Sequence, residues 1–177
     1  MKDKKPPLKG LIAVISIVVI AVVWFAGIQE YTIQTGEEVY LETMPVDPRD
    51  PLRWDFVVLR YAIERDEKVQ DFINSNTMAI IGKTIYITLK KEDNTGVVDS
   101  VSFAKPTSWL FIKWKIEKWS IDLWIWKYFV PEGTGREIEK VRNDMKVLAV
   151  IDKYGTAKIK SLHYRWEEIN PDTFKAN

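Results

Sequence analysis

The sequence predicts a mainly β (α+β) protein, with an antiparallel sheet or a small barrel or sandwich and two short helices, preceded by one N-terminal transmembrane helix. Three observations predict this class: a long uncharged apolar run near the N-terminus, several period-2 stretches rich in β-branched and aromatic residues, and the absence of an internal repeat. We expect a basic segment at residues 1–10, a transmembrane helix at 11–28, a β-rich domain at 29–166 and an unstructured tail at 167–177.

The apolar run at residues 11–28 carries no charge, and the uncharged interval extends from Gly10 to Gln29. A helix needs about 20 mostly apolar residues to cross a bilayer core, so the run is long enough. Lysines crowd the first ten residues and no comparable cluster follows the run, which places the N-terminus in the cytoplasm and the domain outside. The run exceeds the roughly 7–15 apolar residues of a signal peptide, and Trp24 lies where small residues are needed for cleavage. We therefore expect an uncleaved single-pass anchor in the cytoplasmic membrane and an extracytoplasmic domain.

Composition excludes several function classes. The chain has no cysteine, so a disulfide, a thiolate metal site and a cysteine nucleophile are impossible. The formal net charge is +1, and the lysines before the apolar run account for the positive balance. The domain therefore lacks the basic surface that nucleic-acid binding requires, and we expect no nucleic-acid partner.

The first part of the domain is expected to hold two strands and a helix. Residues 31–44 have period-2 alternation with Val39 and Leu41 on one face, which predicts a strand. Three prolines spaced by three then exclude a helix through residues 45–53. Residues 56–63 are β-prone with apolar residues on both faces, which predicts a central strand. Residues 64–76 carry apolar residues at helical spacing, which predicts a short surface helix ended by asparagine.

The rest of the domain alternates strands and turns. A strand at 77–91 has four apolar residues on one face, and the turn at 92–96 makes a hairpin with residues 97–103. The four apolar residues are Ile81, Ile85, Ile87 and Leu89. Residues 109–129 fit two antiparallel strands with a turn near Trp119–Ser120, although a helical period fits as well. A helix at 136–143 and a strand pair at 145–151 and 156–162 complete the domain.

The residues that catalysis or metal binding would need are few. His163 is the only histidine, and a lone histidine forms neither a zinc site nor a triad without further ligands or partners. Asp47, Asp50 and Asp55 match no calcium-binding loop, and capping of tight turns explains the first two. The glycines before Arg136 lack the pattern of a phosphate-binding loop. We expect no catalytic residues, no metal and no cofactor.

Four of the eight tryptophans recur every five residues, at Trp109, Trp114, Trp119 and Trp124. That period places successive rings on opposite faces of a strand, so at least half should lie in the core. The alternative is a glycan- or lipid-binding surface. It requires several of these rings, together with Trp126, to be exposed on one face.

The octet Trp54–Tyr61, W-D-F-V-V-L-R-Y, resembles the signature that names the GDYXXLXY family of bacterial membrane-anchored proteins of unknown function. The residues before it and the block from Tyr128 to Gly133 are similar to further parts of that family. The residues at the positions of the family motif are Asp47, Pro48, Arg49, Leu52, Arg53, Asp55, Phe56, Leu59, Tyr61, Tyr128, Phe129, Pro131, Glu132, Gly133 and Glu139. Trp54 and Phe56 replace the glycine and the first tyrosine of the signature. The resemblance implies one N-terminal span and a link to multi-span membrane proteins, beside which family members are often encoded.

We expect a non-enzymatic, membrane-tethered domain that binds the lipid bilayer through its anchor and assembles with a multi-span membrane protein. The competing hypothesis is a hydrolase like the type I signal peptidases, with Thr43 as nucleophile and Lys83 as general base. We also expect Arg49, Arg53 and Arg60 to pair with the aspartates of the proline-rich segment.

Overall fold

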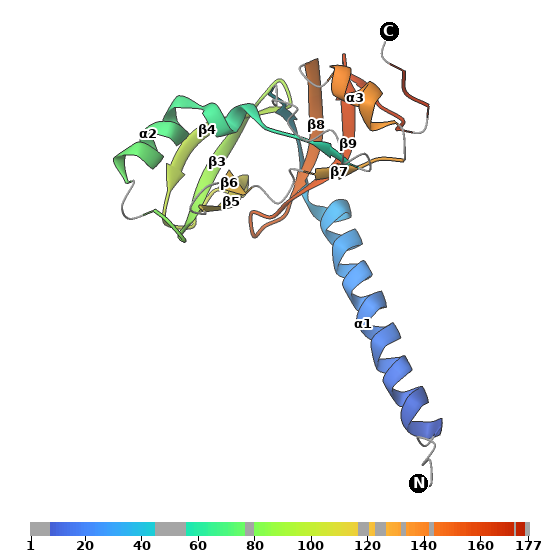
Figure 1. The fold of residues 1–177 in the computed structure, drawn as a ribbon. Helices are drawn as coiled ribbons and strands as arrows, with labels where there is room; N and C mark the ends of the chain where they lie inside the picture. The colour runs from blue at the N-terminus through green and yellow to red at the C-terminus, as the bar shows by residue number, and fades with distance from the viewer. Residues whose placement is uncertain are drawn as a thin grey trace. The chain divides into compact units, whose positions relative to one another are not determined.

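The computed structural model describes residues 8–44, 56–76, 80–116, 121–122, 127–131, 134–141, 144–171 and 173–175 (Figure 1). The chain divides into two compact units, Met1–Thr35 and Gly36–Asn177. The first unit is formed by helix α1 (Leu8–Thr35), and the second contains all the strands.

Within the described residues, α1 is the one helix long and apolar enough to cross a membrane, over Gly10–Thr35. The strand expected from Tyr31 onward is wrong at its start, because α1 continues to Thr35. Polar side chains bond back to the preceding helical turn: Thr35 Oγ1 donates to the Tyr31 carbonyl at 2.8 Å, and Gln34 donates to Glu30 at 2.9 Å. The Gln34–Glu30 contact is an i,i+4 side-chain pair of the kind that stabilises a helix, and the threonine bond is compatible with helical geometry.

Among the described residues, eight strands form one sheet in the order β10-β9-β8-β1-β4-β3-β5-β6. Their bounds are β1 (Glu37–Glu42), β3 (Thr84–Glu92), β4 (Thr95–Ser102), β5 (Phe111–Ile116), β6 (Ile121–Asp122), β8 (Met145–Ile151), β9 (Ala157–Tyr164) and β10 (Glu167–Glu168). The neighbours are antiparallel except β1 and β4, which are parallel and meet at the single pair Tyr40–Thr95. The mainly β class is confirmed, with this parallel contact as a departure from a purely antiparallel sheet.

The sheet curls back toward itself. The Lys113 N–H of β5 donates to the Gly155 carbonyl at 2.8 Å, although three strands lie between β5 and β8 in the sheet order. Gly155 lies in the turn between β8 and β9 with φ +78°. This turn therefore joins two distant parts of the sheet.

Both predicted hairpins are confirmed. Asp93 and Asn94 have φ values of 48° and 65°, so they form the two-residue turn that suits β-hairpins and connect β3 to β4. In the second hairpin, the Asp152 carboxylate accepts from the N–H groups of Tyr154 and Thr156 at 2.8 and 2.9 Å. Local turn chemistry thus sets both registers.

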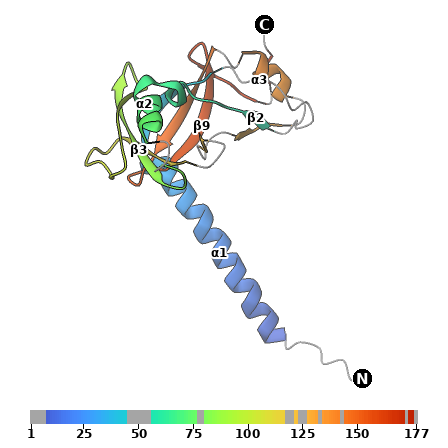
Figure 2. The same ribbon diagram turned by 60° about the vertical axis from the view of Figure 1, so that its left-hand side comes forward.

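Both short helices are confirmed. Asp66 caps α2 (Glu67–Ser75) by accepting from the Lys68 N–H at 3.0 Å, and Asn76 ends it. The Lys68 ammonium donates to the carbonyls of Val98 and Asp99, which holds α2 beside β4 (Figure 2). Helix α3 (Gly135–Val141) buries Ile138.

Much of the core is built from alternate residues of β1, β3, β5 and β8. Its strand residues include Val39, Leu41, Ile85, Ile87, Leu89, Ile112, Trp114, Ile116, Val147, Ala149 and Ile151. The predicted inward faces of residues 37–42 and 84–92 are therefore confirmed. Ile81 is a wrong prediction, since it is 54% exposed in the turn before β3, where Gly82 has φ +77°.

The segment at residues 56–63 is not a central strand. Among the described residues, its first part, β2 (Phe56–Val58), pairs with β7 alone (Lys127–Phe129), in a separate two-stranded sheet. The chain then forms a bridge between Tyr61 and Thr43 and enters the 3₁₀ helix η1 (Ala62–Arg65). Val57, Leu59, Tyr61 and Ile63 are all buried, so one face of the segment packs into the core. The apolar pattern of residues 56–63 therefore predicts that the segment is buried, but it does not predict which strand pairs with β2.

The C-terminal tail and the strand pair within residues 109–129 differ in part from the predictions. The tail is not unstructured throughout, because β10 pairs with β9 and Ile169 is buried in the core. The antiparallel pair within residues 109–129 is confirmed as β5 and β6. The expected turn at Trp119–Ser120 lies outside the described residues.

Candidate functional site

Several predicted site residues lie outside the described residues. They are Asp47, Pro48, Arg49, Leu52, Arg53, Asp55, Glu132 and Gly133, and Asp50 of the calcium hypothesis lies there too. The described member of the arginine set, Arg60, has Glu64 as its carboxylate partner at 3.1 Å. Its predicted pairing with the aspartates of the proline-rich segment involves residues outside the described part of the chain and stays a prediction.

The structure brings the two blocks of the family-like motif together. Phe56 lies opposite Phe129 and Val57 lies opposite Tyr128 in the β2–β7 pair, although the blocks are far apart in the sequence. Leu59 is buried, Tyr128 is half-buried, and Phe129 is 74% exposed. Pro131 is exposed after β7, and Glu139 lies on α3, which contacts β2. The described part of the motif is thus a structural unit that exposes the Phe129 ring.

Tyr61 is fully buried at the end of this unit. Its N–H donates to the Glu64 carboxylate at 3.1 Å, and the same carboxylate binds Arg60. Burial, and then the nearby Glu64 charge, raise the pKa of Tyr61 well above its ordinary value of 10.0.

Tyr61→Phe is expected to reduce the loss of stability at alkaline pH. The folded-state pKa is raised, so the stability contribution is complete below pH 10.0 and is lost as the pH rises above it, because the unfolded chain releases the proton first. One such group lowers the free energy of unfolding by about 1.4 kcal/mol for each pH unit above 10. Urea unfolding in detergent at several pH values above 10 measures the slope. The exposed-ring control Tyr154→Phe should keep the wild-type slope, and an equal slope in Tyr61→Phe would contradict the prediction.

The contacts of Thr43 and Lys83 differ from those of a catalytic dyad. A base must take the proton of the hydroxyl, yet Thr43 Oγ1 donates to the Met145 carbonyl at 2.8 Å. The Lys83 ammonium lies 5.2 Å from the centre of the Phe103 ring, a cation–π contact that a charged lysine makes. These contacts do not favour the hydrolase hypothesis.

His163 is buried on β9. Its Nε2 lies 2.9 Å from the Ser161 hydroxyl, and the structure shows no hydrogen-bond partner for its Nδ1 among the described residues. Its ring meets Tyr40 edge to face at 5.1 Å between centroids. The histidine therefore packs within the sheet.

The tryptophan series divides between core and surface. Trp114 is fully buried, whereas Trp109 is 62% exposed. Trp119, Trp124 and Trp126 lie outside the described residues. Trp109 and Trp114 therefore lie in opposite environments, as the five-residue period predicts. They do not form one exposed aromatic surface.

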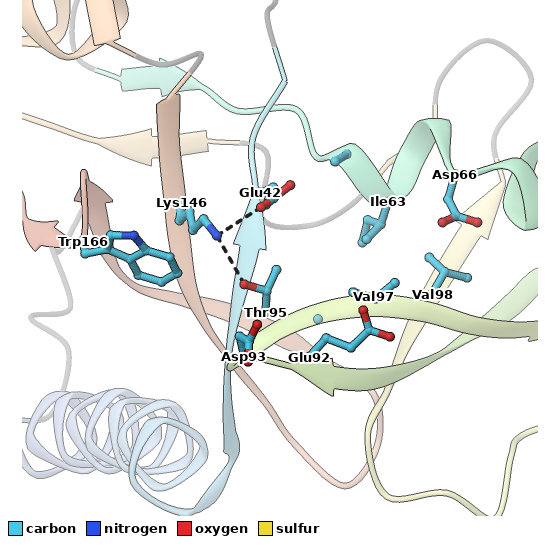
Figure 3. Close-up of a pocket in the computed structure, with 12 residues that line it drawn as sticks. Glu42, Ile63, Asp66, Glu92, Asp93, Thr95, Val97, Val98, Lys146 and Trp166 are labelled. Atoms are coloured by element: carbon cyan, nitrogen blue, oxygen red, sulfur yellow. Dashed lines mark hydrogen bonds and ion pairs between the residues drawn. The ribbon is translucent and has the colours of Figure 1, made fainter.

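A cleft of about 410 Å³ opens where β4 separates from β1 (Figure 3). The two strands meet at Tyr40 and Thr95. Three residues after Tyr40, just past the end of β1, Thr43 is bridged by Tyr61 instead. The lining comes from β1, η1, the β3–β4 hairpin, β8 and the β9–β10 turn. It comprises Glu42, Ala62, Ile63, Asp66, Glu92, Asp93, Thr95, Gly96, Val97, Val98, Lys146 and Trp166.

One end of the cleft holds the ammonium group of Lys146. Its Nζ lies 3.0 Å from a Glu42 carboxylate oxygen, 3.3 Å from the Thr95 hydroxyl and 4.1 Å from the centre of the Trp166 ring. Trp166 is 60% exposed and has φ +72°, a region that tryptophan rarely adopts. The turn that presents this ring is therefore held in place by the pairing of β9 with β10 and by the edge-to-face contact of the ring with Tyr40 at 5.7 Å.

The other end of the cleft combines carboxylates with apolar surface. Asp66 and Glu92 lie beside Ile63, Val97 and Val98 in Figure 3. The sequence does not indicate this cleft, because the residues that line it come from separate elements of the chain and share no motif. The only local signal is the Asp93–Asn94 turn, which predicts a hairpin and not a cleft.

The comparison with protein-family models matches residues 17–162 to the family described as GDYXXLXY protein. Neither the search of curated proteins nor the search of solved structures found a match. The matched range spans most of the chain and includes the β2–β7 pair and the cleft up to β9. The chain belongs to the GDYXXLXY family.

Proposed function

We propose that this protein is a single-pass membrane protein whose β domain, on the outer side of the cytoplasmic membrane, binds and assembles with a multi-span membrane protein. The observation that carries the proposal is the direct connection of a spanning-length apolar helix to a β domain. Gly36 alone separates α1 from β1 in the chain. The family resemblance to proteins linked with multi-span membrane proteins supports the same class of partner.

The short connection restricts which partners the domain reaches. The apolar run ends at Ile28, and the seven further residues of α1 extend about 10 Å at the rise of a helix. The domain therefore begins close to the bilayer that α1 crosses. A membrane-embedded partner then meets the domain at a high effective concentration, which favours binding by modest surfaces.

Single-cysteine labelling tests the orientation. The chain contains no cysteine, so Lys4→Cys and Lys153→Cys each introduce one thiol without background. Lys153 is exposed in the β8–β9 turn. A membrane-impermeant maleimide is expected to label Lys153→Cys in intact cells, and to label Lys4→Cys only after permeabilisation, because the lysines before α1 stay in the cytoplasm. The reverse pattern would reject the outer location.

Affinity purification of the full-length chain in mild detergent tests the partner. We expect a multi-span membrane protein to co-purify in fixed proportion. A matched control carries an unrelated transmembrane helix in place of residues 10–28, and it should retain the partner if the β domain provides the contact. Purification of the chain without any membrane protein, together with a hydrolytic activity, would contradict the proposed function.

A further inference from the structure

We infer that a surface of the β domain binds the anionic headgroups of phospholipids in the bilayer that α1 crosses. This surface, named the turn surface, consists of Lys105, Lys113, Lys153 and Tyr154, which are all exposed. The inference goes beyond the proposed function, because it assigns a lipid contact to the β domain itself. It shares with the proposed function only the membrane anchor.

The fold brings the turn surface together from distant stretches of the chain. Lys153 and Tyr154 lie in the β8–β9 turn, and the Gly155 carbonyl of that turn accepts from the Lys113 N–H of β5 at 2.8 Å. Lys105 reaches the same place from the loop between β4 and β5, with its Nζ 5.6 Å from the centre of the Tyr154 ring. The surface is therefore formed in the folded domain before any ligand binds.

The lysines of the turn surface have no carboxylate partner in the part of the chain that the structure describes. The ion pairs of that part involve other basic residues. Lys105 and Lys153 make cation–π contacts instead, with Nζ 5.6 and 5.2 Å from the centre of the Tyr154 ring. Their ammonium groups therefore remain available to an anion.

The neighbouring carboxylates do not cancel this charge. Asp152 accepts from two N–H groups inside the β8–β9 turn, at 2.8 and 2.9 Å. Glu37 and Glu38, at the start of β1, each form an ion pair with a lysine outside the turn surface. Three ammonium groups therefore face one carboxylate, and the turn surface is net positive.

The aromatic residues give this region the composition of a membrane interface. The Tyr154 side chain is 59% exposed, and Trp109, in the same loop as Lys105, is 62% exposed. Tyrosine and tryptophan collect at the headgroup level of a bilayer, because each has an apolar ring and a polar tip. Lysine stems cover apolar surface while their ammonium groups reach outward. Phospholipid headgroups supply both the anion and the apolar boundary that such a surface fits.

The turn surface lies at the end of the sheet where the chain enters from α1. Glu37 is the second residue after α1 and pairs with Ile151 at the end of β8, and the β8–β9 turn follows directly. A connection this short keeps the turn surface near the bilayer, at a high effective concentration of headgroups. Weak contacts with single headgroups are then sufficient, because α1 already provides the attachment.

Fluorescence quenching in lipid nanodiscs tests the inference with the full-length chain. The chain has no cysteine, so Thr107→Cys, in the exposed loop of Lys105, carries a single fluorophore. The quencher is a phospholipid with a nitroxide on its headgroup, and fluorescence lifetimes separate docked from undocked domains. We expect strong quenching in nanodiscs rich in phosphatidylglycerol and weak quenching in phosphatidylcholine. High salt should reduce the quenching, because exposed charges are screened.

A label at the opposite end of the sheet is the matched control for position. Thr173 is exposed, and the next residue, Phe174, contacts Tyr164 at the far end of β9. Thr173→Cys with the same fluorophore should stay unquenched in both lipids. Equal quenching at Thr107 and Thr173 would show that the domain has no preferred face toward the bilayer, and it would overturn the inference.

A pair of double variants tests the lysines. Lys105→Gln with Lys153→Gln should lower the ratio of docked to undocked domains about twenty- to thirtyfold, because each lysine near an anionic surface contributes about fivefold. Lys140→Gln with Lys175→Gln makes the same change of net charge at exposed positions outside the turn surface and should keep the ratio. Equal ratios in the two double variants, or equal quenching of the wild-type chain in the two lipids, would overturn the inference.

The outcomes separate this inference from the proposed function. Nanodiscs contain no membrane-protein partner, so quenching reports on lipid contact alone. If the chain co-elutes with nanodiscs but the Thr107 label is not quenched, the lipid inference fails and the proposed function stands. If the chain does not co-elute with nanodiscs, the membrane anchor is rejected and both fail. If lipid-dependent quenching is found but no membrane protein co-purifies with the chain, the lipid inference stands and the proposed partner is rejected.

Discussion

Gly155→Ala is expected to destabilise the protein by about 2–5 kcal/mol. A Cβ atom at this position would lie 2.5 Å from Phe111 Cε2 and 3.0 Å from the Lys113 backbone nitrogen, closer than packed atoms approach. Overpacking of this kind costs about 1–3 kcal/mol. The left-handed φ of +78° adds about 1–2 kcal/mol for a residue with a side chain. The contact that would be disturbed is the one that joins the β8–β9 turn to β5.

Gly82→Ala separates the steric cost of the added Cβ atom from the conformational cost of the left-handed φ. Gly82 has nearly the same φ, +77°, but a Cβ atom there would meet no atom of the described residues within 4 Å. This variant should therefore lose only the conformational part, about 1–2 kcal/mol. Urea unfolding of the full-length chain in detergent, followed by near-ultraviolet circular dichroism, measures both variants. Equal losses in the two would show that the contact between the turn and Phe111 contributes nothing to stability.

Trp114→Ala is expected to cost about 3–5 kcal/mol, because it empties a large volume in the hydrophobic core. The Trp114 side chain is fully buried, on β5 opposite Ile85 of β3. Its indole nitrogen has no hydrogen-bond partner among the described residues, so the stabilisation comes from apolar packing. Trp114→Phe should therefore recover much of the loss.

Trp109→Ala is the matched control for that prediction. Its ring is 62% exposed, and such surface substitutions usually change stability by less than about 0.5 kcal/mol. The same unfolding measurement compares the two variants. A large loss in Trp109→Ala with little loss in Trp114→Ala would reverse the assignment of core and surface within the tryptophan series.

Local patterns predicted many of the elements correctly. The turn at Asp93–Asn94 was predictable because residues with short polar side chains tolerate left-handed backbone angles. The inward faces of β1 and β3 were predictable because side chains alternate along a strand. The errors lie where a short local pattern competed with its surroundings, as at Tyr31, which continues the helix.

The family-like motif shows the limit of this reasoning. The apolar residues on both faces of 56–63 predicted a strand buried on two sides, and the buried residues Val57, Leu59 and Tyr61 lie on one face. The same pattern predicted a central strand, whereas among the described residues β2 pairs with β7 alone. Period 2 determines which side chains face inward, but the choice of neighbouring strand depends on the whole packed sheet.

The sequence by itself determined the apolar helix at the N-terminus, the mainly β class, the two hairpin turns and the inward residues of β1 and β3. These features depend on composition and on neighbours within a few residues. Only the tertiary structure decided that β1 and β4 meet at one pair and then separate. That separation creates the cleft, and it gathers Glu42, Asp66, Glu92 and Lys146 from distant parts of the chain. Contacts of this range depend on how the completed sheet curls, which no local pattern encodes.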